Sequence, residues 1–346
     1  MSIALFSGCA SEESPHKFQR YTLGTYVQLQ IYSSKHQADE FIKQFDQLSK
    51  KQTKDLYAWG DGWLTVQNRF LENAQCGLPV DDDSMVFFQK LKDLHAHSSG
   101  LFDPAIMPLV ELWGFHKSEE MRSVPPTDEE IESLMARYGN MQDIELHDRK
   151  ICAKRPLKVD LGGVAKGWAA QQAFEMLYEH GINNALIGFG GDLIALGHKP
   201  DGSPWKVGLK NPDIHSKGFD APAIFTLDKR ESSATAVFTS GDYERQFEYK
   251  GKRSHHILDP RSGYPNTAIR SVTVIHSDPI LADAAATALH VAGEDWQNIA
   301  KQMKVENVLV LFPNKKAQIT NSMNDLTSWQ DPDYKVEVIA QLNSTY

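Results

Sequence analysis

The order of strand-like and helix-like segments constrains the fold of this chain more than any other feature. Strand patterns occur singly and in clusters, with helical patterns between them, and do not alternate strictly with helices. The expected strands are Tyr21–Tyr32, Ile144–His147, Ala185–Leu196, Trp205–Leu209, Ala234–Thr239, Gln246–Tyr249, Ser271–His276 and Asn307–Phe312. The expected helices are His36–Leu56, Ser84–His97, one from 125–130 through Arg137, Gly163–His180 and Pro279–Ala292. The sequence therefore predicts an α+β fold that forms one compact unit after residue 20, over residues 21–346.

The composition is that of a folded globular protein. Of the 346 residues, 41% are hydrophobic and 23% are charged, which excludes a disordered chain, a collagen-like chain and a coiled-coil rod. Lys and Arg total 36 against 45 Asp and Glu, and the net charge of −9 argues against a broad nucleic-acid-binding surface. The sequence contains no stretch of about 20 apolar residues, so we expect no membrane-spanning helix.

The three cysteines are Cys9, Cys76 and Cys152, and no two of them form a Cys-x-x-Cys pair. This argues against a disulfide framework and against a structural zinc knuckle. Cys9 follows an apolar run and precedes a polar segment, so residues 1–20 resemble the lipobox and tether of a bacterial lipoprotein. The run is short and no Lys or Arg precedes it, whereas a full signal has a charged start. A chance match is the alternative.

The expected helix Pro279–Ala292 carries the first candidate site. Asp278 and Pro279 form a typical helix start. Asp283 and Thr287 are four residues apart, so they lie on one face of the helix, one turn from each other. A carboxylate and a hydroxyl are hard oxygen donors suited to Mg²⁺. The alternative, which the spacing alone favours, is an ordinary capped helix in which Thr287 bonds to the main-chain carbonyl of Asp283.

A second candidate site is the glycine turn before the expected helix Gly163–His180. A short apolar run containing Asp160 ends at Gly162 and Gly163, where main-chain amides at a helix start can hold a phosphate. Lys166 adds a point charge. The Gly-Lys-Ser/Thr ending of a Walker A loop is absent. A plain strand-to-helix turn explains this stretch equally well.

Two other patterns favour structural interpretations. Gly188–Leu193 lacks the last glycine of a dinucleotide-binding fingerprint and continues as a strand, which indicates a bulge or a close approach by a ligand or another backbone. His95 and His97 are expected at a solvated helix end.

A candidate general base follows the strand cluster near residue 250. The segments Thr239–Arg245 and Ser254–Pro260 meet at one sheet edge if the residues between them form a hairpin. His256, with Asp259 nearby, then suits acid–base chemistry near neutral pH. The alternative is a histidine that serves only the fold.

Taken together, these segments resemble the ApbE family, the FAD:protein FMN transferases. The matching stretches occur in the family's order and cover nearly the whole chain from about residue 20. They are Leu23-Gly24-Thr25, Gly100-Leu101-Phe102-Asp103-Pro104, Trp113-Gly114-Phe115, Asp160 through Gly167, Gly190-Gly191-Asp192, Thr239 through Tyr243, His256 through Pro260, and Ala282-Asp283 with Thr287. The resemblance implies a compact α+β architecture that is ApbE-like and T-fold-like.

The resemblance also implies an activity. Family members are Mg²⁺-dependent enzymes that cleave the pyrophosphate of FAD, attach FMN to a Thr or Ser hydroxyl of a target protein through a phosphoester bond, and release AMP. Their targets include subunits of sodium-pumping quinone reductases and Rnf-type electron-transfer complexes. Many are lipoproteins, which agrees with the lipobox-like start, so we expect a periplasmic protein anchored to the inner membrane by lipid. The alternatives are an FAD pyrophosphatase and a flavin-binding lipoprotein without turnover.

Carried over by position, the resemblance implies roles for individual residues. The metal ligands are the side chains of Asp283 and Thr287 with a main-chain carbonyl of the glycine turn, assigned to Gly163. His256 takes the proton of the incoming hydroxyl and Asp259 orients it, with Asp160 as the competing base or positioning group. The flavin-contacting positions are Leu23, Tyr57, Leu101, Phe102, Asp103, Asp160, Lys166 and Ile257. Leu23 stands where the family usually has Met, and the alignment around Tyr57 is irregular.

Overall fold

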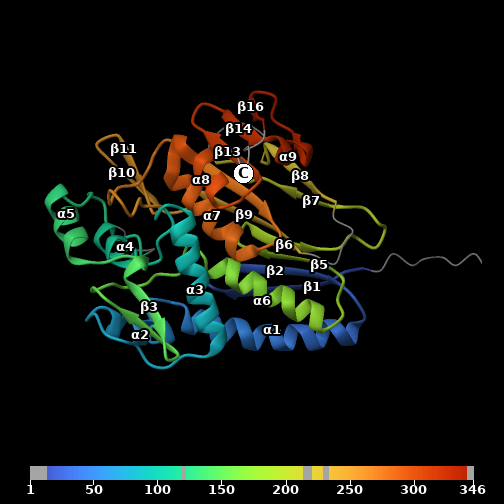
Figure 1. The fold of residues 1–346 in the computed structure, drawn as a ribbon. Helices are drawn as coiled ribbons and strands as arrows, with labels where there is room; N and C mark the ends of the chain where they lie inside the picture. Colours follow the sequence, from blue (N-terminus) through green and yellow to red (C-terminus); the bar gives the residue numbers. More distant parts are fainter. Residues whose placement is uncertain (1–13, 118–121, 213–219, 229–233, 341–346) are drawn as a thin grey trace, which may run out of the picture.

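The computed structural model describes residues 14–117, 122–212, 220–228 and 234–340 (Figure 1). Across these ranges, nine strands form one sheet in the order β1-β2-β5-β6-β9-β12-β13-β14-β16. Its strands are His16–Thr22, Thr25–Tyr32, Asn184–Phe189, Asp192–Leu196, Thr235–Gly241, Ser271–His276, Asn307–Phe312, Lys316–Thr320 and Lys335–Ile339. Neighbouring strands are antiparallel except β14 and β16, which pair in parallel.

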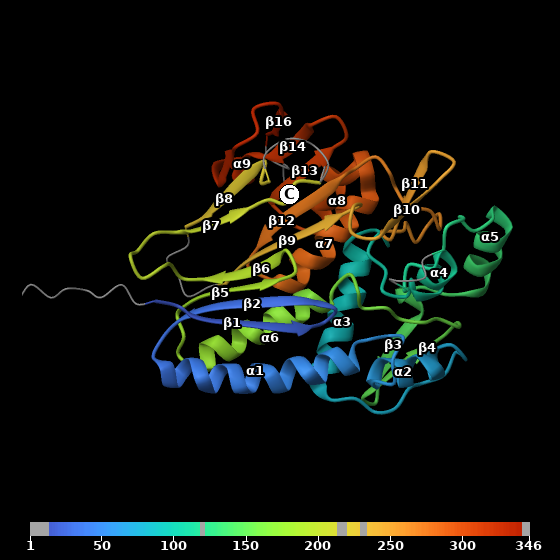
Figure 2. The ribbon, with the colours of Figure 1, turned by 180° about the vertical axis from the view of Figure 1, so that it is seen from behind.

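A layer of helices covers one face of this sheet, and the short helix at residues 321–325 packs on the other face. The helices of the described residues are α1 Lys35–Asp55, α2 Trp63–Leu71, α3 Asp82–His97, α4 Met107–Trp113, α5 Asp128–Arg137, α6 Ala165–Glu179, α7 Pro279–Ala292, α8 Trp296–Gln302 and α9 Asn321–Asp325. Helix α7 packs on β9 and β12, α6 packs on α7, and α1 packs on α6 (Figures 1 and 2). The site described below lies where α6, α7 and β9 meet.

Three smaller sheets complete the fold of the described residues. They are β3 Ile144–His147 with β4 Lys150–Ala153, β10 Gln246–Tyr249 with β11 Lys252–His255, and β7 Trp205–Gly208 with β8 Ala223–Leu227 and β15 Thr327–Trp329. The last of these contributes to a second hydrophobic cluster, which also takes Val237 of β9, Ile275 of β12, and Leu309 and Leu311 of β13. Because successive side chains of a strand point to opposite faces, these central strands are buried on both sides.

The α+β prediction is confirmed, and five elements of the described residues have the expected bounds: Ile144–His147, Gln246–Tyr249, Ser271–His276, Asn307–Phe312 and Pro279–Ala292. The expected hairpin between residues 245 and 256 is also present, as β10 and β11. No helix in the described ranges is both long and apolar enough to cross a bilayer. The lipobox-like segment around Cys9 lies outside the described residues.

Two expected strands are hairpins. Tyr21–Tyr32 is divided into β1 and β2 by Leu23 and Gly24, which have φ angles of 52° and 72°. Ala185–Leu196 is divided into β5 and β6 by Gly190 and Gly191, also with positive φ. The residues that flank each turn face each other, Thr22 opposite Thr25 and Phe189 opposite Asp192, so the alternation of side chains shifts by one residue at the turn. The expectation of one long strand missed this shift because the segments on both sides have the composition of strands.

The folded region begins before the expected boundary at residue 20. Strand β1 starts at His16 and pairs along its whole length with β2. The expected tether at residues 1–20 is therefore too long by the first part of this strand.

Candidate active site

Helix α7 presents Asp283 and Thr287 to the start of α6. The carboxylate of Asp278 accepts hydrogen bonds from the amides of Ile280 and Leu281 at 3.0 Å each, which confirms the expected helix start. The Thr287 hydroxyl lies 3.1 Å from the hydroxyl of Ser240 on β9. The alternative bond from Thr287 to the Asp283 carbonyl is not among the hydrogen bonds of the described residues. Helix capping alone therefore does not account for this pair.

Close packing of α6 against α7 determines the surroundings of Asp283. A Cβ on Gly167 would lie 2.6 Å from the carbonyl oxygen of Pro279 and 2.9 Å from Cβ of Asp283, so glycine is required there. The Gly167 amide, in the first turn of α6, donates to Oδ2 of Asp283 at 2.8 Å. The carboxylate thus accepts from an amide that has no partner within its own helix.

Lys166 and Asp192 extend this cluster toward the β5–β6 turn. The Lys166 ammonium forms an ion pair with Oδ2 of Asp192, whose Oδ1 accepts from the Thr239 amide at 2.7 Å. Burial opposes the charge on Lys166, but attraction to Asp192 and Asp283 outweighs it and raises the pKa of the ammonium.

Asp283 is the group of this cluster with the least favourable surroundings for its charge. Its side chain is 5% exposed, and burial, with repulsion from Asp192, raises its pKa to about 7. Lys166 and the Gly167 amide act in the opposite direction. A cation beside Asp283 would therefore favour its ionised form.

The glycine turn lies beside Thr287. A Cβ on Gly163 would lie 3.6 Å from Oγ1 of Thr287 and 3.8 Å from Cε2 of Phe102. The Gly162 amide donates to Oδ1 of Asp160 at 2.9 Å. The three positions expected to hold a metal, Gly163, Asp283 and Thr287, thus lie together. The added hydroxyl of Ser240 makes this an oxygen-rich set that suits a hard cation.

One residue that holds the glycine turn was not predicted. Asn68 on α2 is 3% exposed and forms two hydrogen bonds with the main chain of Val159, accepting from its amide and donating to its carbonyl at 2.8 Å each. The next residue, Asp160, donates its amide to the Pro104 carbonyl at 2.8 Å. These contacts fix the chain that enters the turn.

His256 lies on a segment that Arg245 holds in place. The His256 amide donates to the Arg245 carbonyl at 3.0 Å, and Nδ1 of His256 is buried without a hydrogen-bond partner among the described residues. Burial and then the charge of Arg245 lower the pKa of His256 well below its usual value. Burial raises the pKa of Asp160, and Arg245 opposes that change. His256 is therefore neutral, the form that can accept a proton.

The expectation that Asp259 orients His256 is wrong. Oδ1 of Asp259 accepts from the amide and Nε of Arg261 at 2.8 and 3.1 Å, and Oδ2 accepts from Nη2 at 2.9 Å. Arg261 follows Asp259 by two residues along a turn, so its side chain reaches the carboxylate more readily than the His256 imidazole does. The charged guanidinium also makes a stronger hydrogen bond than a neutral imidazole.

The loop that contains Leu101, Phe102 and Asp103 is buried. The Asp103 carboxylate accepts from the amides of Ala105 and Met141 at 2.9 and 3.3 Å. His95 is buried beside it, with Nδ1 3.1 Å from the Phe102 carbonyl, so the expected solvated helix end is wrong for this histidine. The edge of the Phe102 ring, near Gly163, links the loop to the metal-ligand candidates.

The buried carboxyl of Asp103 should make the stability of the protein depend on pH. Burial raises its pKa to about 7. The folded state therefore holds this proton more tightly than the unfolded state, and the contribution of Asp103 to stability falls as the pH rises from about 4 to 7. We expect the Asp103→Asn variant to gain about 2–3 kcal/mol in free energy of unfolding relative to wild type between roughly pH 5 and 8. The free energy of unfolding of both proteins is measured by urea unfolding at several pH values. The same dependence on pH for wild type and Asp103→Asn would contradict the prediction.

The remaining flavin positions are spread around the cluster. Leu23 is half-buried in the β1–β2 turn. A Cβ on Gly190 would lie 2.0 Å from Oγ1 of the nearby Thr25, so a side chain approaches the second glycine turn, where a ligand or another backbone was expected. Ile257 is buried. Tyr57 is 52% exposed between α1 and α2, with its ring 6.0 Å from that of Trp59. No contact in the described residues joins Tyr57 to Asp283.

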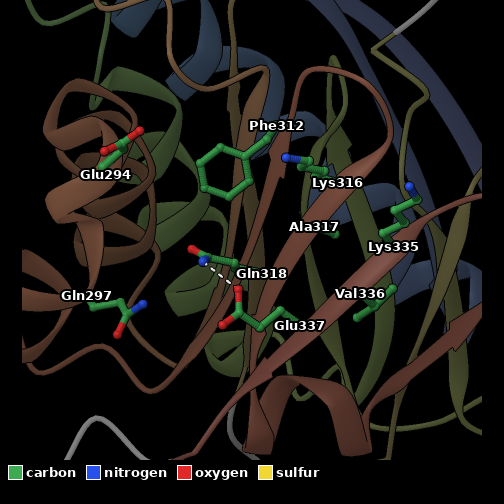
Figure 3. Close-up of a pocket in the computed structure, with 9 residues that line it drawn as sticks. All are labelled: Glu294, Gln297, Phe312, Lys316, Ala317, Gln318, Lys335, Val336 and Glu337. Atoms are coloured by element: carbon green, nitrogen blue, oxygen red, sulfur yellow. Dashed lines mark hydrogen bonds between the residues drawn. The ribbon is translucent and has the colours of Figure 1, made fainter.

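A shallow pocket of about 580 Å³ lies elsewhere, at the C-terminal edge of the large sheet (Figure 3). It is lined by Glu294, Gln297, Phe312, Lys316, Ala317, Gln318, Lys335, Val336 and Glu337. The amide of Gln318 donates to Glu337 at 2.8 Å across it. None of the residues predicted for catalysis, flavin or metal binding lines this pocket.

The fold and the oxygen-rich cluster together suit an enzyme site. The chain belongs to the ApbE family, because the family model matches residues 23–310. It is 34% identical to a FAD:protein FMN transferase of Rhodobacter capsulatus over 84% of this chain and 54% of that protein. It is 30% identical to one of Klebsiella pneumoniae over 95% of this chain and 98% of that protein. The crystal structure of the ApbE protein of Thermotoga maritima matches with a TM-score of 0.79 and 30% identity, over 90% and 99% of the two chains.

Proposed function

We propose that this chain is an FAD:protein FMN transferase. It cleaves the diphosphate of FAD, joins FMN to a Thr or Ser hydroxyl of an acceptor protein, and releases AMP. The observation that carries the proposal is the convergence of Asp283, Thr287 and Gly163 beside Lys166, in a chain of the ApbE family.

The donor set fits Mg²⁺. Asp283, Thr287 and the main chain at Gly163 would hold the ion, with the Ser240 hydroxyl adjacent. When bound, the ion neutralises charge on the diphosphate oxygens.

The chain's own groups position the other reactants. Lys166 supplies positive charge at the start of α6, where main-chain amides also favour a phosphate. The neutral His256 imidazole accepts the proton of the acceptor hydroxyl as its oxygen bonds to the phosphorus of the FMN portion. The phosphorus–oxygen bond to AMP breaks, and AMP departs with that oxygen. Asp160 and Arg245 position this end of the site.

The partners and location follow from the same proposal. The acceptors are flavin-carrying subunits of electron-transfer complexes, of the sodium-pumping quinone reductase or Rnf type. The protein is periplasmic and attached to the inner membrane through lipid on Cys9. The disulfide between Cys76 and Cys152 supports an oxidising compartment. We expect the wild-type chain to be recovered with membranes and the Cys9→Ser variant in the soluble fraction. Equal fractionation of the two would contradict the lipid anchor.

One assay tests the activity against its alternatives. The full chain is incubated with FAD, Mg²⁺ and an acceptor protein, and the same acceptor with its target Thr changed to Val serves as the control. A fluorescent acceptor band together with AMP is the expected result. FMN and AMP without a labelled acceptor would instead establish the FAD pyrophosphatase, and unchanged FAD would establish a flavin-binding protein without turnover.

A further inference from the structure

The segment 75–80 holds Cys76 directly against Cys152. It runs antiparallel to β4, with hydrogen bonds from the Gly77 amide to the Ile151 carbonyl at 2.8 Å and from the Ala153 amide to the Gln75 carbonyl at 3.3 Å. Cys76 and Cys152 face each other in this ladder and form a disulfide. The main chain thus holds the two sulfur atoms close together independently of the bond between them.

His147 reaches the same place from the adjacent strand. In the β3–β4 hairpin Cys152 lies opposite Glu145, and His147 follows two residues later, so it points to the same face. The ligand atoms of Cys76, His147 and Cys152 all lie within 4.8 Å of one another. Nδ1 of His147 lies 3.5 Å from the Asp148 carboxylate, an arrangement that leaves Nε2 free to bind a metal.

We propose that the reduced form of this cysteine pair, together with His147, is a binding site for one Zn²⁺ ion. A dithiol reduces the disulfide to two thiols and is itself oxidised to a cyclic disulfide. Binding of Zn²⁺ then releases one proton from each thiol. Two thiolates and a neutral imidazole supply three ligands, and water completes the tetrahedral set that zinc prefers.

Exposure makes both steps accessible. Cys76 and His147 are exposed whereas Cys152 is buried, so an attacking thiolate reaches the sulfur of Cys76. The site lies on the β3–β4 hairpin beside α2, at the opposite end of the molecule from β14 and β16 (Figure 2). It shares no residue with the cluster around Asp283, so its metal is separate from the cation of the proposed transferase site.

The experiment compares zinc binding by the oxidised and reduced protein. The full chain carrying Cys9→Ser, so that only Cys76 and Cys152 provide thiols, is treated with a phosphine reductant or left oxidised. Both samples are mixed with Zn²⁺ and desalted, and the metal content per chain is measured. We expect one more Zn²⁺ per chain in the reduced sample, and we expect this extra ion to persist in an Asp283→Ala variant.

Two variants test the ligands. Cys76→Ser should abolish the extra ion, and His147→Ala should weaken its affinity at least tenfold, whereas His97→Ala, at an exposed histidine on α3, should have no effect. Co²⁺ added to the reduced chain that carries only Cys9→Ser should give thiolate-to-metal absorption, a readout that does not depend on whether a ligand variant folds. Any of three results would overturn the proposal. They are equal zinc content in both redox states, loss of the extra ion in Asp283→Ala, and equal effects of His147→Ala and His97→Ala.

Discussion

Asp283→Ala is expected to abolish FMN transfer even with FAD in excess, with a loss of at least about 10³-fold. The substitution removes the carboxylate that the donor set offers to a cation, and it removes the acceptor of the Gly167 amide. Phosphoryl transfer depends mainly on placement and electrostatics, so the loss should exceed that caused by His256→Ala. The measurement is the initial rate of acceptor labelling with saturating FAD and Mg²⁺.

Two further variants separate the charge from the hydrogen bond. Asp283→Asn keeps an oxygen that can accept from the Gly167 amide but lacks the negative charge, so it should be nearly as inactive as Asp283→Ala while retaining more stability. Asp39→Ala, at an exposed position on α1, is the control and should leave the rate unchanged. Near-normal transfer by Asp283→Asn would show that the negative charge of Asp283 is not needed for FMN transfer.

The proposed roles of Asp283 and Lys166 depend on each other. Two buried carboxylates, Asp192 and Asp283, act on one ammonium, so the cluster carries an excess of negative charge. Such an excess is unfavourable inside a protein unless a cation compensates it. Burial, with repulsion from Asp192, raises the pKa of Asp283 to about 7, and a divalent ion beside the carboxylate would oppose both effects. This gives a physical reason for the site to bind metal before the substrate arrives.

Local sequence patterns predicted the elements that have strong start signals or long apolar runs. Helix α7 has Asp278 and Pro279 at its start, and both expected bounds agree with the structure. Helix α2 went unpredicted because its N-cap, Gly62, has no side chain to bond to the first turn. Strand β16 went unpredicted because Lys335 and Glu337 alternate with valines at a sheet edge, where little apolar surface is buried.

The candidate site was predictable only where its contacts are local in sequence. The spacing of Asp283 and Thr287 places them on one helix face, and the paired glycines mark a turn. In contrast, no local pattern shows that Asn68 binds the main chain of Val159, 91 residues away. The partner of Asp259 was predicted wrongly for a different reason. His256 and Arg261 are both close to Asp259 in sequence, and only the geometry shows that the carboxylate binds Arg261.

Asp242→Ala is expected to lower the free energy of unfolding by about 3–5 kcal/mol, the largest effect on stability that we predict. Asp242 at the end of β9 is fully buried and forms ion pairs with Arg253 on β11 and with Arg270, whose Nη1 lies 3.0 Å away. Removing the carboxylate leaves two guanidinium groups close together without their shared anion. Losing a buried shared anion costs more than losing its hydrogen bonds alone, so the effect should exceed that of an ordinary hydrogen-bond deletion.

The matched control for Asp242 is an exposed ion pair on the next turn. Glu244 pairs with Lys210 at 2.8 Å, and both side chains are about half exposed, so Glu244→Ala should cost at most about 1 kcal/mol. The measurement is the urea unfolding midpoint of each variant. Equal midpoints for Asp242→Ala and Glu244→Ala would contradict the prediction. Because Asp242 follows Ser240 by two residues, its loss should also displace the hydroxyl beside Thr287, so FMN transfer should fall even at temperatures where the variant remains folded.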